Sequence, residues 1–334
     1  MTGRTMRVRK LGPFDVNPVG LGCMNLSHAY GHPLSRKDGL SVLQKALDSG
    51  VTHFDSAALY GFGHSEELVG PFLKPHRDNV VLVSKCGMRG ENGARSIGGT
   101  PDALRRDLEA SLRRLDADVI DLYYLHRYDK VTPIEDSVGQ LSRFVDEGKV
   151  RAIGLSEVSA DTLRRAHAVH PIAAVQSEYS LWSRNPEIAV LDACEELGAG
   201  FVAFSPLARG FLTDVDVHPG EFIEKDIRRS MPRFHEPNFS KNTELLGKYR
   251  TIAKEASCTG AQLSLAWLLH QSPNLHVIPG TTSVDHLAEN VGAAEITLDA
   301  ATLEQVGELV NQETISGPRY PEQTQKEIDT EEFA

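Results

Sequence analysis

Eight short apolar runs separated by longer amphipathic stretches constrain the fold of this chain most. None of the runs alternates in polarity, which is typical of strands buried on both faces of a parallel sheet. Helices are expected between them, for example after Thr100-Pro101-Asp102, where a capping residue and a proline precede leucines spaced by three and four. The runs occupy residues 19–22, 51–54, 80–84, 119–125, 152–155, 173–175, 201–204 and 275–278.

Eight such units predict an α/β fold, a (β/α)8 TIM barrel over residues 1–334 as a single domain. An open, doubly wound sheet is the alternative. The barrel is favoured because functional-looking polar residues follow nearly every run, whereas a doubly wound sheet would gather them near one switch point. Residues 7–11 and 14–17 are expected to pair as an N-terminal β-hairpin that closes the bottom of the barrel.

Three long connections are expected at the C-terminal face, because long loops in a compact domain are usually functional or mobile. Residues 86–99 follow the third run, and residues 208–240 follow the seventh as a long loop over a bound cofactor. Residues 313–334 form a C-terminal tail, in which residues 316–321 are placed to fold back over the mouth of the barrel.

Bulk composition restricts the partners. The net charge of −11 argues against nucleic acid as the main partner. No secretory signal is visible, and no run approaches the roughly 18 apolar residues of a membrane span. The sequence therefore predicts a cytoplasmic protein without a membrane partner, and it leaves the oligomeric state open. His28 and His32 are interpreted as loop residues, so no metal site is indicated.

Four ionisable residues stand at the ends of three neighbouring runs. Asp55 and Tyr60 follow the second run, Lys85 follows the third, and His126 follows the fourth. Parallel strands would bring all four to one pole of the barrel. A Lys85 ammonium would lower the tyrosine pKa from about 10, and Asp55 would keep that lysine charged. This arrangement predicts a proton donor for a carbonyl oxygen that gains charge as a hydride adds, so a nicotinamide cofactor is implied.

The chain resembles the aldo-keto reductases over nearly its whole length, and within them the bacterial aldehyde- and pyridoxal-reductase-like branch. The order and spacing of many short motifs carry the likeness. They are Gly20-Leu21-Gly22-Cys23-Met24, Phe54-Asp55-Ser56-Ala57 with Tyr60-Gly61, Ser84-Lys85, Asp121-Leu122-Tyr123-Tyr124-Leu125-His126, Gly148-Lys149-Val150-Arg151, Ile153-Gly154-Leu155-Ser156, Gln176, Phe204-Ser205-Pro206-Leu207, and Ile278-Pro279-Gly280-Thr281 with Glu289-Asn290.

The resemblance implies an NADPH-dependent oxidoreductase that reduces aldehydes or ketones, with Asp55, Tyr60, Lys85 and His126 as its catalytic residues. It also implies a set of cofactor-binding residues. In chain order these are Gly22, Cys23, Met24, Ser156, Gln176, Phe204, Ser205, Pro206, Leu207, Arg209, Gly280, Thr281, Thr282, His286, Glu289 and Asn290.

Two positions depart from the family pattern. Many relatives have Asn where this chain has Glu157, which places its contact with the nicotinamide carboxamide in doubt. Many NADPH-preferring relatives carry Lys or Arg near the 2′-phosphate, where this chain has Gly280 and His286. A bidentate arginine grip is therefore absent, so NADP(H) is expected as the preferred cofactor and NAD(H) as a possible one.

The substrate pocket is expected to be apolar and to include Met24, Leu59 and Trp182, together with part of the 86–99 loop. Arg89, Arg95 and Arg127 are candidates for recognising an anionic group on the substrate.

Two other functions are compatible with the same scaffold. One is a nucleotide-binding regulatory subunit resembling the potassium-channel β subunits. The other is a barrel enzyme such as an aldolase that uses Lys85 as a Schiff base; this requires a depressed lysine pKa, which Asp55 would instead raise.

Overall fold

Eight parallel strands form one sheet in a computed structural model that describes residues 8–91 and 94–333. Their order across the sheet follows the chain from the first to the last. The strands are β3 (Leu21–Gly22), β4 (His53–Asp55), β5 (Val81–Cys86), β8 (Ile120–Leu125), β9 (Val150–Ser156), β10 (Ala174–Glu178), β11 (Gly200–Phe204) and β12 (Leu275–Val277).

The first and last strands meet, so the sheet closes on itself. A parallel bridge pairs Val19 with Val277, and the Gly20 amide donates to the Val277 carbonyl at 2.9 Å. The predicted (β/α)8 barrel is therefore confirmed, and the open doubly wound sheet is wrong. All eight apolar runs lie in or beside barrel strands, with boundaries that differ by at most three residues.

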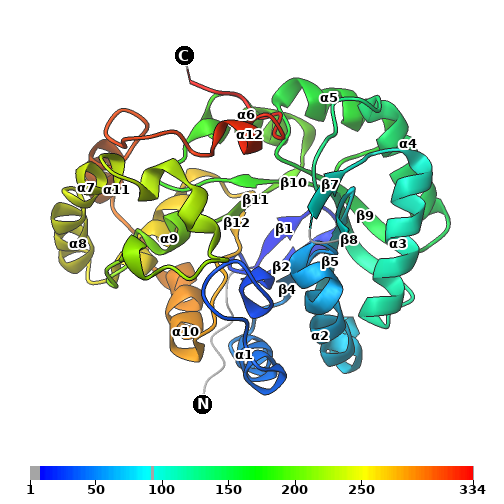
Figure 1. Ribbon diagram of the computed structural model, residues 1–334, viewed down its shortest axis with the longest axis horizontal. Helices are drawn as coiled ribbons and strands as arrows, with labels where there is room; N and C mark the ends of the chain where they lie inside the picture. The colour runs from blue at the N-terminus through cyan, green and yellow to red at the C-terminus, as the bar shows by residue number, and fades with distance from the viewer. Residues whose placement is uncertain (1–7, 92–93, 334) are drawn as a thin grey trace.

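Helices surround the barrel on the outside (Figure 1). Their starts follow local chemistry: Thr259 and Gln262 form a reciprocal capping box at the start of α9. The helices are α1 (Arg36–Asp48), α2 (His64–Leu73), α3 (Pro101–Leu115), α4 (Ile134–Asp146), α5 (Ala160–Val169), α6 (Val190–Leu197), α7 (Asn238–Thr243), α8 (Leu246–Glu255), α9 (Gly260–Gln271), α10 (Val284–Gly292), α11 (Ala300–Leu309) and α12 (Glu322–Gln325).

Side chains fill the barrel as a packed core of its own. Val81, Val83, Leu122 and Tyr124 belong to this interior cluster, while the intervening residues of the same strands pack against the helices. In the strand register His53 pairs with Val81 and Asp55 with Val83. Because side chains alternate along a strand, His53 and Asp55 both face the barrel interior, in successive layers.

The bottom of the barrel is closed by the antiparallel hairpin of β1 (Arg9–Leu11) and β2 (Phe14–Val16), which confirms the predicted hairpin. Leu11 and Val16 insert into the interior core. Residue 7, where the hairpin was expected to begin, lies outside the described residues.

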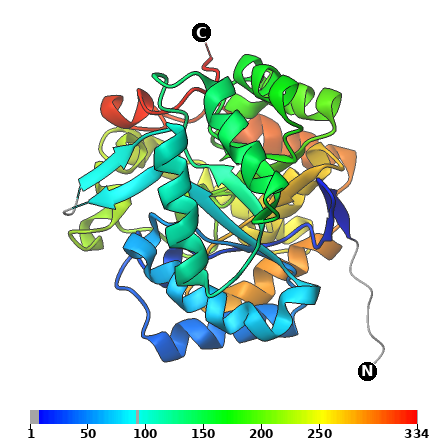
Figure 2. The same ribbon diagram turned by 90° about the vertical axis from the view of Figure 1, so that its right-hand side faces the viewer.

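A second antiparallel hairpin, β6 (Met88–Glu91) and β7 (Ala94–Ile97), stands on the opposite side of the molecule (Figure 2). It lies within the 86–99 segment that was expected to be a loop, because glycines there obscure any strand pattern. The 208–240 segment contains short 3-10 turns and the start of α7, and its Ile227 amide donates to the Ala29 carbonyl at 3.0 Å.

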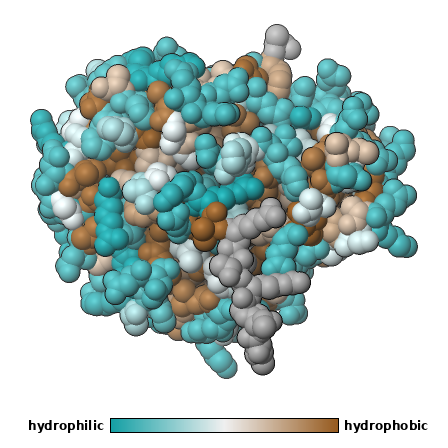
Figure 3. Space-filling model, turned by 180° about the vertical axis from the view of Figure 1, so that it is seen from behind, coloured by the Kyte–Doolittle hydropathy of each residue, from teal (hydrophilic) through white to brown (hydrophobic). Residues whose placement is uncertain are grey.

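Within the described ranges, no helix combines the length and apolar character needed to cross a bilayer. The face shown in Figure 3 is mostly hydrophilic, with small scattered apolar patches. Isolated exposed apolar side chains such as Phe62 and Val131 are ordinary on a protein surface.

Candidate active site

Lys85 is the centre of a buried polar cluster at the C-terminal ends of β4, β5 and β8. Its Nζ forms an ion pair with the Asp55 carboxylate, donates to the Ser56 carbonyl at 2.9 Å and lies 3.2 Å from the Tyr60 hydroxyl. The side chains of Lys85 and Asp55 are 0% and 1% exposed. The structure thus brings three of the four predicted catalytic residues into direct contact, in a site from which water is largely excluded.

The protonation states follow from burial and from the ion pair. Burial disfavours the charge on Lys85, but Asp55 and Tyr60 outweigh it, so the pKa of Lys85 is raised. Burial raises the pKa of Tyr60 above its usual value, and Lys85 offsets only part of that rise. The sequence led us to expect a lowered tyrosine pKa; the direction is the opposite, because desolvation of the phenolate exceeds the stabilisation from Lys85. Tyr60 is therefore a neutral hydrogen-bond donor at neutral pH.

His126 lies beside this cluster, with its ring edge-on to the Tyr60 ring at a centroid distance of 5.8 Å. Burial, reinforced by Lys85 and Arg127, holds the pKa of His126 well below its ordinary value. Its buried Nδ1 has no hydrogen-bond partner among the described residues. His28, which the sequence analysis interpreted only as a loop residue, also approaches Tyr60, with a ring-centroid distance of 5.8 Å.

Ser156, the last residue of β9, and Gln176, the middle residue of β10, were predicted to hold the nicotinamide amide, and both are buried. Gln176 donates to the second Asp55 oxygen at 2.7 Å, so this residue and the Asp55–Lys85 pair form one network. Ser156 Oγ accepts from Arg127 at 3.1 Å. Arg127, an anion-binding candidate, therefore borders the site, and no acidic partner of it lies in the described part of the chain.

The other predicted cofactor residues lie at the same pole. Gly22, Cys23 and Met24 end β3 and begin the turn after it, and the Cys23 amide donates to the Asp55 carbonyl at 2.8 Å. Phe204 ends β11 and is followed by Ser205, Pro206 and Leu207. Gly280, Thr281 and Thr282 follow β12, and a Cβ added at Gly280 would lie 2.7 Å from the Asn25 side chain, so glycine is needed there.

Residues of α10 provide a structural test of whether a dinucleotide fits. His286 and Glu289 lie on this helix toward its exposed side, and Asn290 is buried. The Oδ1 of Asn290 has no hydrogen-bond partner among the described residues, although buried amide oxygens are normally paired. An adenine amino group would supply the missing donor, so the residues present fit the adenosine end of a dinucleotide.

The predicted substrate-pocket residues differ in their burial and in their neighbours. Met24 and Leu59 are half-buried next to the catalytic residues in the chain. Trp182 is buried in an aromatic cluster, stacked on Phe211 at 4.8 Å and edge-on to Phe234 at 5.6 Å. It makes no ring contact or hydrogen bond with the catalytic residues within the described ranges.

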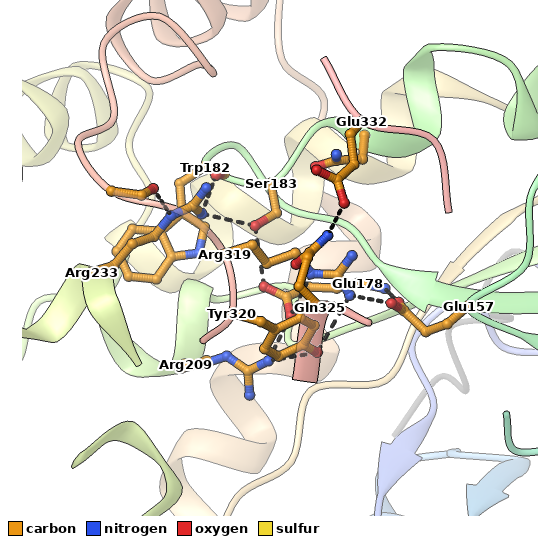
Figure 4. Close-up of polar contacts among 12 residues, drawn as sticks. Glu157, Glu178, Trp182, Ser183, Arg209, Arg233, Arg319, Tyr320, Gln325 and Glu332 are labelled. Atoms are coloured by element: carbon orange, nitrogen blue, oxygen red, sulfur yellow. Dashed lines mark hydrogen bonds and ion pairs between the residues drawn. The ribbon is translucent and has the colours of Figure 1, made fainter. Parts of the chain in front are cut away.

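A second buried charged cluster adjoins the first and was not predicted from the sequence (Figure 4). Glu178, two residues beyond Gln176 on β10, accepts from Arg209 at 2.5 Å and lies 3.2 Å from Arg319 Nε. Arg319 in turn donates to Glu157 at 2.5 Å. Burial alone would raise the pKa of Glu178, but the guanidinium groups outweigh it and lower that pKa to about 2.

Glu157 and Arg209 therefore have partners that the family pattern did not suggest. The Glu157 carboxylate also accepts from the Glu178 backbone amide at 2.7 Å, so it is turned into the protein. Arg209 contacts Tyr320 Oη at 3.1 Å and Tyr30 Oη at 3.2 Å. The polar run Gln176-Ser177-Glu178 at the end of an otherwise apolar strand was the one sequence signal that pointed to this cluster.

The comparisons with known proteins agree with this geometry. The model of the aldo/keto reductase family matches residues 18–311. The aldo-keto reductase yakc of Schizosaccharomyces pombe, whose name specifies NADP(+), is 44% identical over 320 residues, which is 94% of each chain.

Two solved structures are similar over nearly the whole chain. A glycerol dehydrogenase from Gluconobacter oxydans superimposes with a TM-score of 0.81 at 28% identity, over 92% of this chain and 95% of its own. An aldo-keto reductase from Klebsiella pneumoniae, solved in complex with NADPH, gives a TM-score of 0.72 at 27% identity, over 92% and 96%.

Proposed function

Because this chain belongs to the aldo/keto reductase family, we propose that it reduces the carbonyl group of aldehydes or ketones to an alcohol, with NADPH as the hydride donor and Tyr60 as the general acid. The observation that carries the proposal is the contact of Lys85 with both the Tyr60 hydroxyl and the Asp55 carboxylate inside a buried site. A phenol held against a paired ammonium group is suited to giving its proton to an oxygen that becomes negative.

The proton step follows from the protonation states. When bound, the nicotinamide supplies the hydride that adds to the carbonyl carbon. Tyr60 is neutral and donates a hydrogen bond to the carbonyl oxygen, then its proton as negative charge develops there. Lys85, 3.2 Å from the hydroxyl, stabilises the phenolate that remains. His126, with a pKa that keeps it uncharged, offers a second donor to the same oxygen.

Asp55 has two tasks in this scheme. It keeps Lys85 charged despite complete burial, and through Gln176 it links the acid to the residues proposed for the carboxamide of the nicotinamide. The Schiff-base alternative is disfavoured by the raised pKa of Lys85, because a lysine nucleophile must be unprotonated.

The remaining contacts follow the family pattern. Ser156 and Gln176 are proposed for the carboxamide, Phe204 for the face of the nicotinamide ring, and the segment from Ser205 to Arg209 for the diphosphate. The turn at residues 280–282 and the α10 residues His286, Glu289 and Asn290 are proposed for the adenosine end. The family pattern leads us to expect a preference for NADPH. Because Gly280 and His286 provide no bidentate cation for the 2′-phosphate, we also expect measurable use of NADH.

The test is a steady-state assay that follows oxidation of NADPH or NADH with aromatic, aliphatic and sugar-derived aldehydes. The proposal predicts turnover with NADPH and at least one aldehyde class, and weaker turnover with NADH. Tight nucleotide binding without turnover of any carbonyl compound would contradict it.

A further inference from the structure

The residue after Ser156 has a backbone conformation that its own chemistry disfavours. Glu157 has φ 56°, in the left-handed region, which is strained for a residue other than glycine. Asn and Asp enter this region most readily, because their short side chains bond locally, and Glu lacks that advantage. Glu157 must therefore be held in place by other groups.

Three contacts hold it. The Glu157 amide donates to the Gln176 carbonyl at 3.0 Å, and one carboxylate oxygen accepts from the Glu178 amide at 2.7 Å. The other carboxylate oxygen accepts from Arg319 at 2.5 Å. Of these, only the contact with Arg319 neutralises the charge of a side chain that is fully buried.

Arg319 is carried by the C-terminal tail and is linked to Arg209, in the loop after β11, through shared partners. It shares the Glu178 carboxylate with Arg209, at 3.2 Å and 2.5 Å respectively. Both arginines also donate to the Tyr320 hydroxyl, at 3.3 Å and 3.1 Å. Figure 4 shows Glu178 and Tyr320 between the two guanidinium groups, with Glu157 on the far side of Arg319.

The two regions that Arg319 joins are the two ends of the proposed nicotinamide–diphosphate site. Glu157 directly follows Ser156, which is proposed for the carboxamide. Arg209 has φ 59° and ends the segment proposed for the diphosphate, in which Ser205 and Ala208 also have left-handed backbones. Arg319 supplies the opposite charge for Glu157, whereas Glu178 is also paired with Arg209 and lies in the field of Arg233. Removing Arg319 therefore leaves Glu157 unpaired, while Glu178 keeps Arg209.

We propose that Arg319 is a positioning residue for the dinucleotide, which fixes the Ser156–Glu157 turn from the C-terminal tail. This inference rests on the proposed function. According to this inference, the C-terminal tail is part of the cofactor site. Many relatives have Asn at position 157, which adopts the left-handed conformation without a charged partner, whereas Glu157 needs Arg319 to hold the same turn.

The test is a double-variant cycle with Arg319→Met and Glu157→Asn, in which the Kd for NADPH is measured by isothermal titration. Arg319→Met alone leaves Glu157 buried and unpaired, and we expect NADPH to bind about tenfold more weakly. In the Glu157→Asn background, Asn supports the turn, and Glu178 still pairs with Arg209 when Arg319 is replaced. There we expect Arg319→Met to change the Kd by less than about twofold.

Two further measurements separate positioning from general stabilisation. For Arg319→Met, kcat at saturating NADPH should stay within about threefold of wild type while KM for NADPH rises with Kd. The control is Lys326→Met, which removes an exposed tail lysine paired with Glu322 and should leave the Kd unchanged. If Arg319→Met does not fold, the Kd for NADPH of the double variant is compared with that of Glu157→Asn. The double variant removes both charges of the pair, so neither is left unpaired.

Equal weakening by Arg319→Met in both backgrounds, or a lower Tm with an unchanged Kd, would overturn the inference. So would a double variant that binds NADPH tenfold more weakly than Glu157→Asn. A wild-type protein that does not bind NADPH would overturn the proposed function and the inference with it. Equal binding by wild type and Arg319→Met overturns the inference alone.

Discussion

The upper and lower layers of the barrel interior treat buried ionisable side chains in opposite ways. In the upper layer, Asp55 and Lys85 are charged and paired with each other. In the lower layer, His53 and His276 are neutral, and burial lowers the pKa of each to about 3. Asp55 and His53 are only two residues apart on β4, so depth in the protein does not explain the difference.

The hydrogen-bond and ion-pair partners of each side chain explain the difference between the two layers. Asp55 receives Lys85 and Gln176, whereas His53 has no hydrogen-bond partner among the described residues and lies against Gly20, where an added Cβ would be 2.9 Å from Nδ1. Removing a charge from water is offset only by an opposite charge and further hydrogen bonds. The upper layer therefore carries charge where opposite charges meet. In the lower layer, His276 bonds to the uncharged Lys10 carbonyl, at 3.0 Å, and both histidines stay neutral.

The largest expected effect concerns the tyrosine of the upper layer. Tyr60→Phe should lower kcat by about 10²–10⁴-fold, the usual contribution of a general acid, with little change in Tm. The matched control is Tyr123→Phe, at a buried tyrosine of β8 that packs toward the helices. Steady-state kinetics and thermal melts measure both. Full activity in Tyr60→Phe would remove the proposed acid.

The second prediction compares ion pairs of the two poles. Lys85→Met leaves Asp55 buried and unpaired and should lower the free energy of unfolding by about 3–5 kcal/mol. Lys10→Met removes an exposed lysine that pairs with Asp15 on the lower hairpin, and should have no measurable effect. Denaturant titrations provide the comparison. Similar small losses in both variants would show that the upper pair is not effectively buried.

Lowering the pH should reduce the free energy of unfolding through the two histidines of the lower layer. The unfolded chain binds protons at histidines below about pH 6.5, but folded His53 and His276 do not until about pH 3. Stability is therefore full above pH 6.5 and falls toward pH 3, by at most about 1.4 kcal/mol per pH unit for each histidine.

A His53→Gln or His276→Gln variant tests this slope. Each should lose stability less steeply than wild type in denaturant titrations across that range. The contributions of His126 and Glu178 are common to all three proteins and cancel in the comparison. An unchanged slope would mean that these histidines are not neutral when folded.

The smallest expected effect concerns His286, on the part of α10 proposed for the adenosine end of the cofactor. His286→Arg should add a bidentate cation near the 2′-phosphate and tighten NADPH binding about tenfold, without improving NADH. The ratio of the two Kd values is the measurement. A parallel change for both cofactors would place His286 away from the 2′-phosphate.

The sequence was informative where local chemistry decides the outcome. Continuous apolar runs predicted every barrel strand, and strand ends placed Asp55, Tyr60, Lys85 and His126 at one pole. The β6–β7 hairpin was missed because Gly90 and the neighbouring glycines weaken the strand pattern in the sequence. The two strands form nonetheless, because they pair with each other.

The second charged cluster was missed for a different reason. The Glu157–Arg319 pair joins residues 162 positions apart, and no spacing rule connects them. The direction of the Tyr60 pKa was also wrong, because the sequence shows that Lys85 is near but not how completely the phenol is buried.

The pH dependence of a single turnover tests the central claim most directly. Protein saturated with NADPH is mixed with an aldehyde, and the rate of reduction is measured across pH. Since burial raises the pKa of Tyr60 above about 10, the rate should stay constant from neutral pH to about pH 10 and fall only beyond it. A fall centred near pH 7 would show that another group supplies the proton.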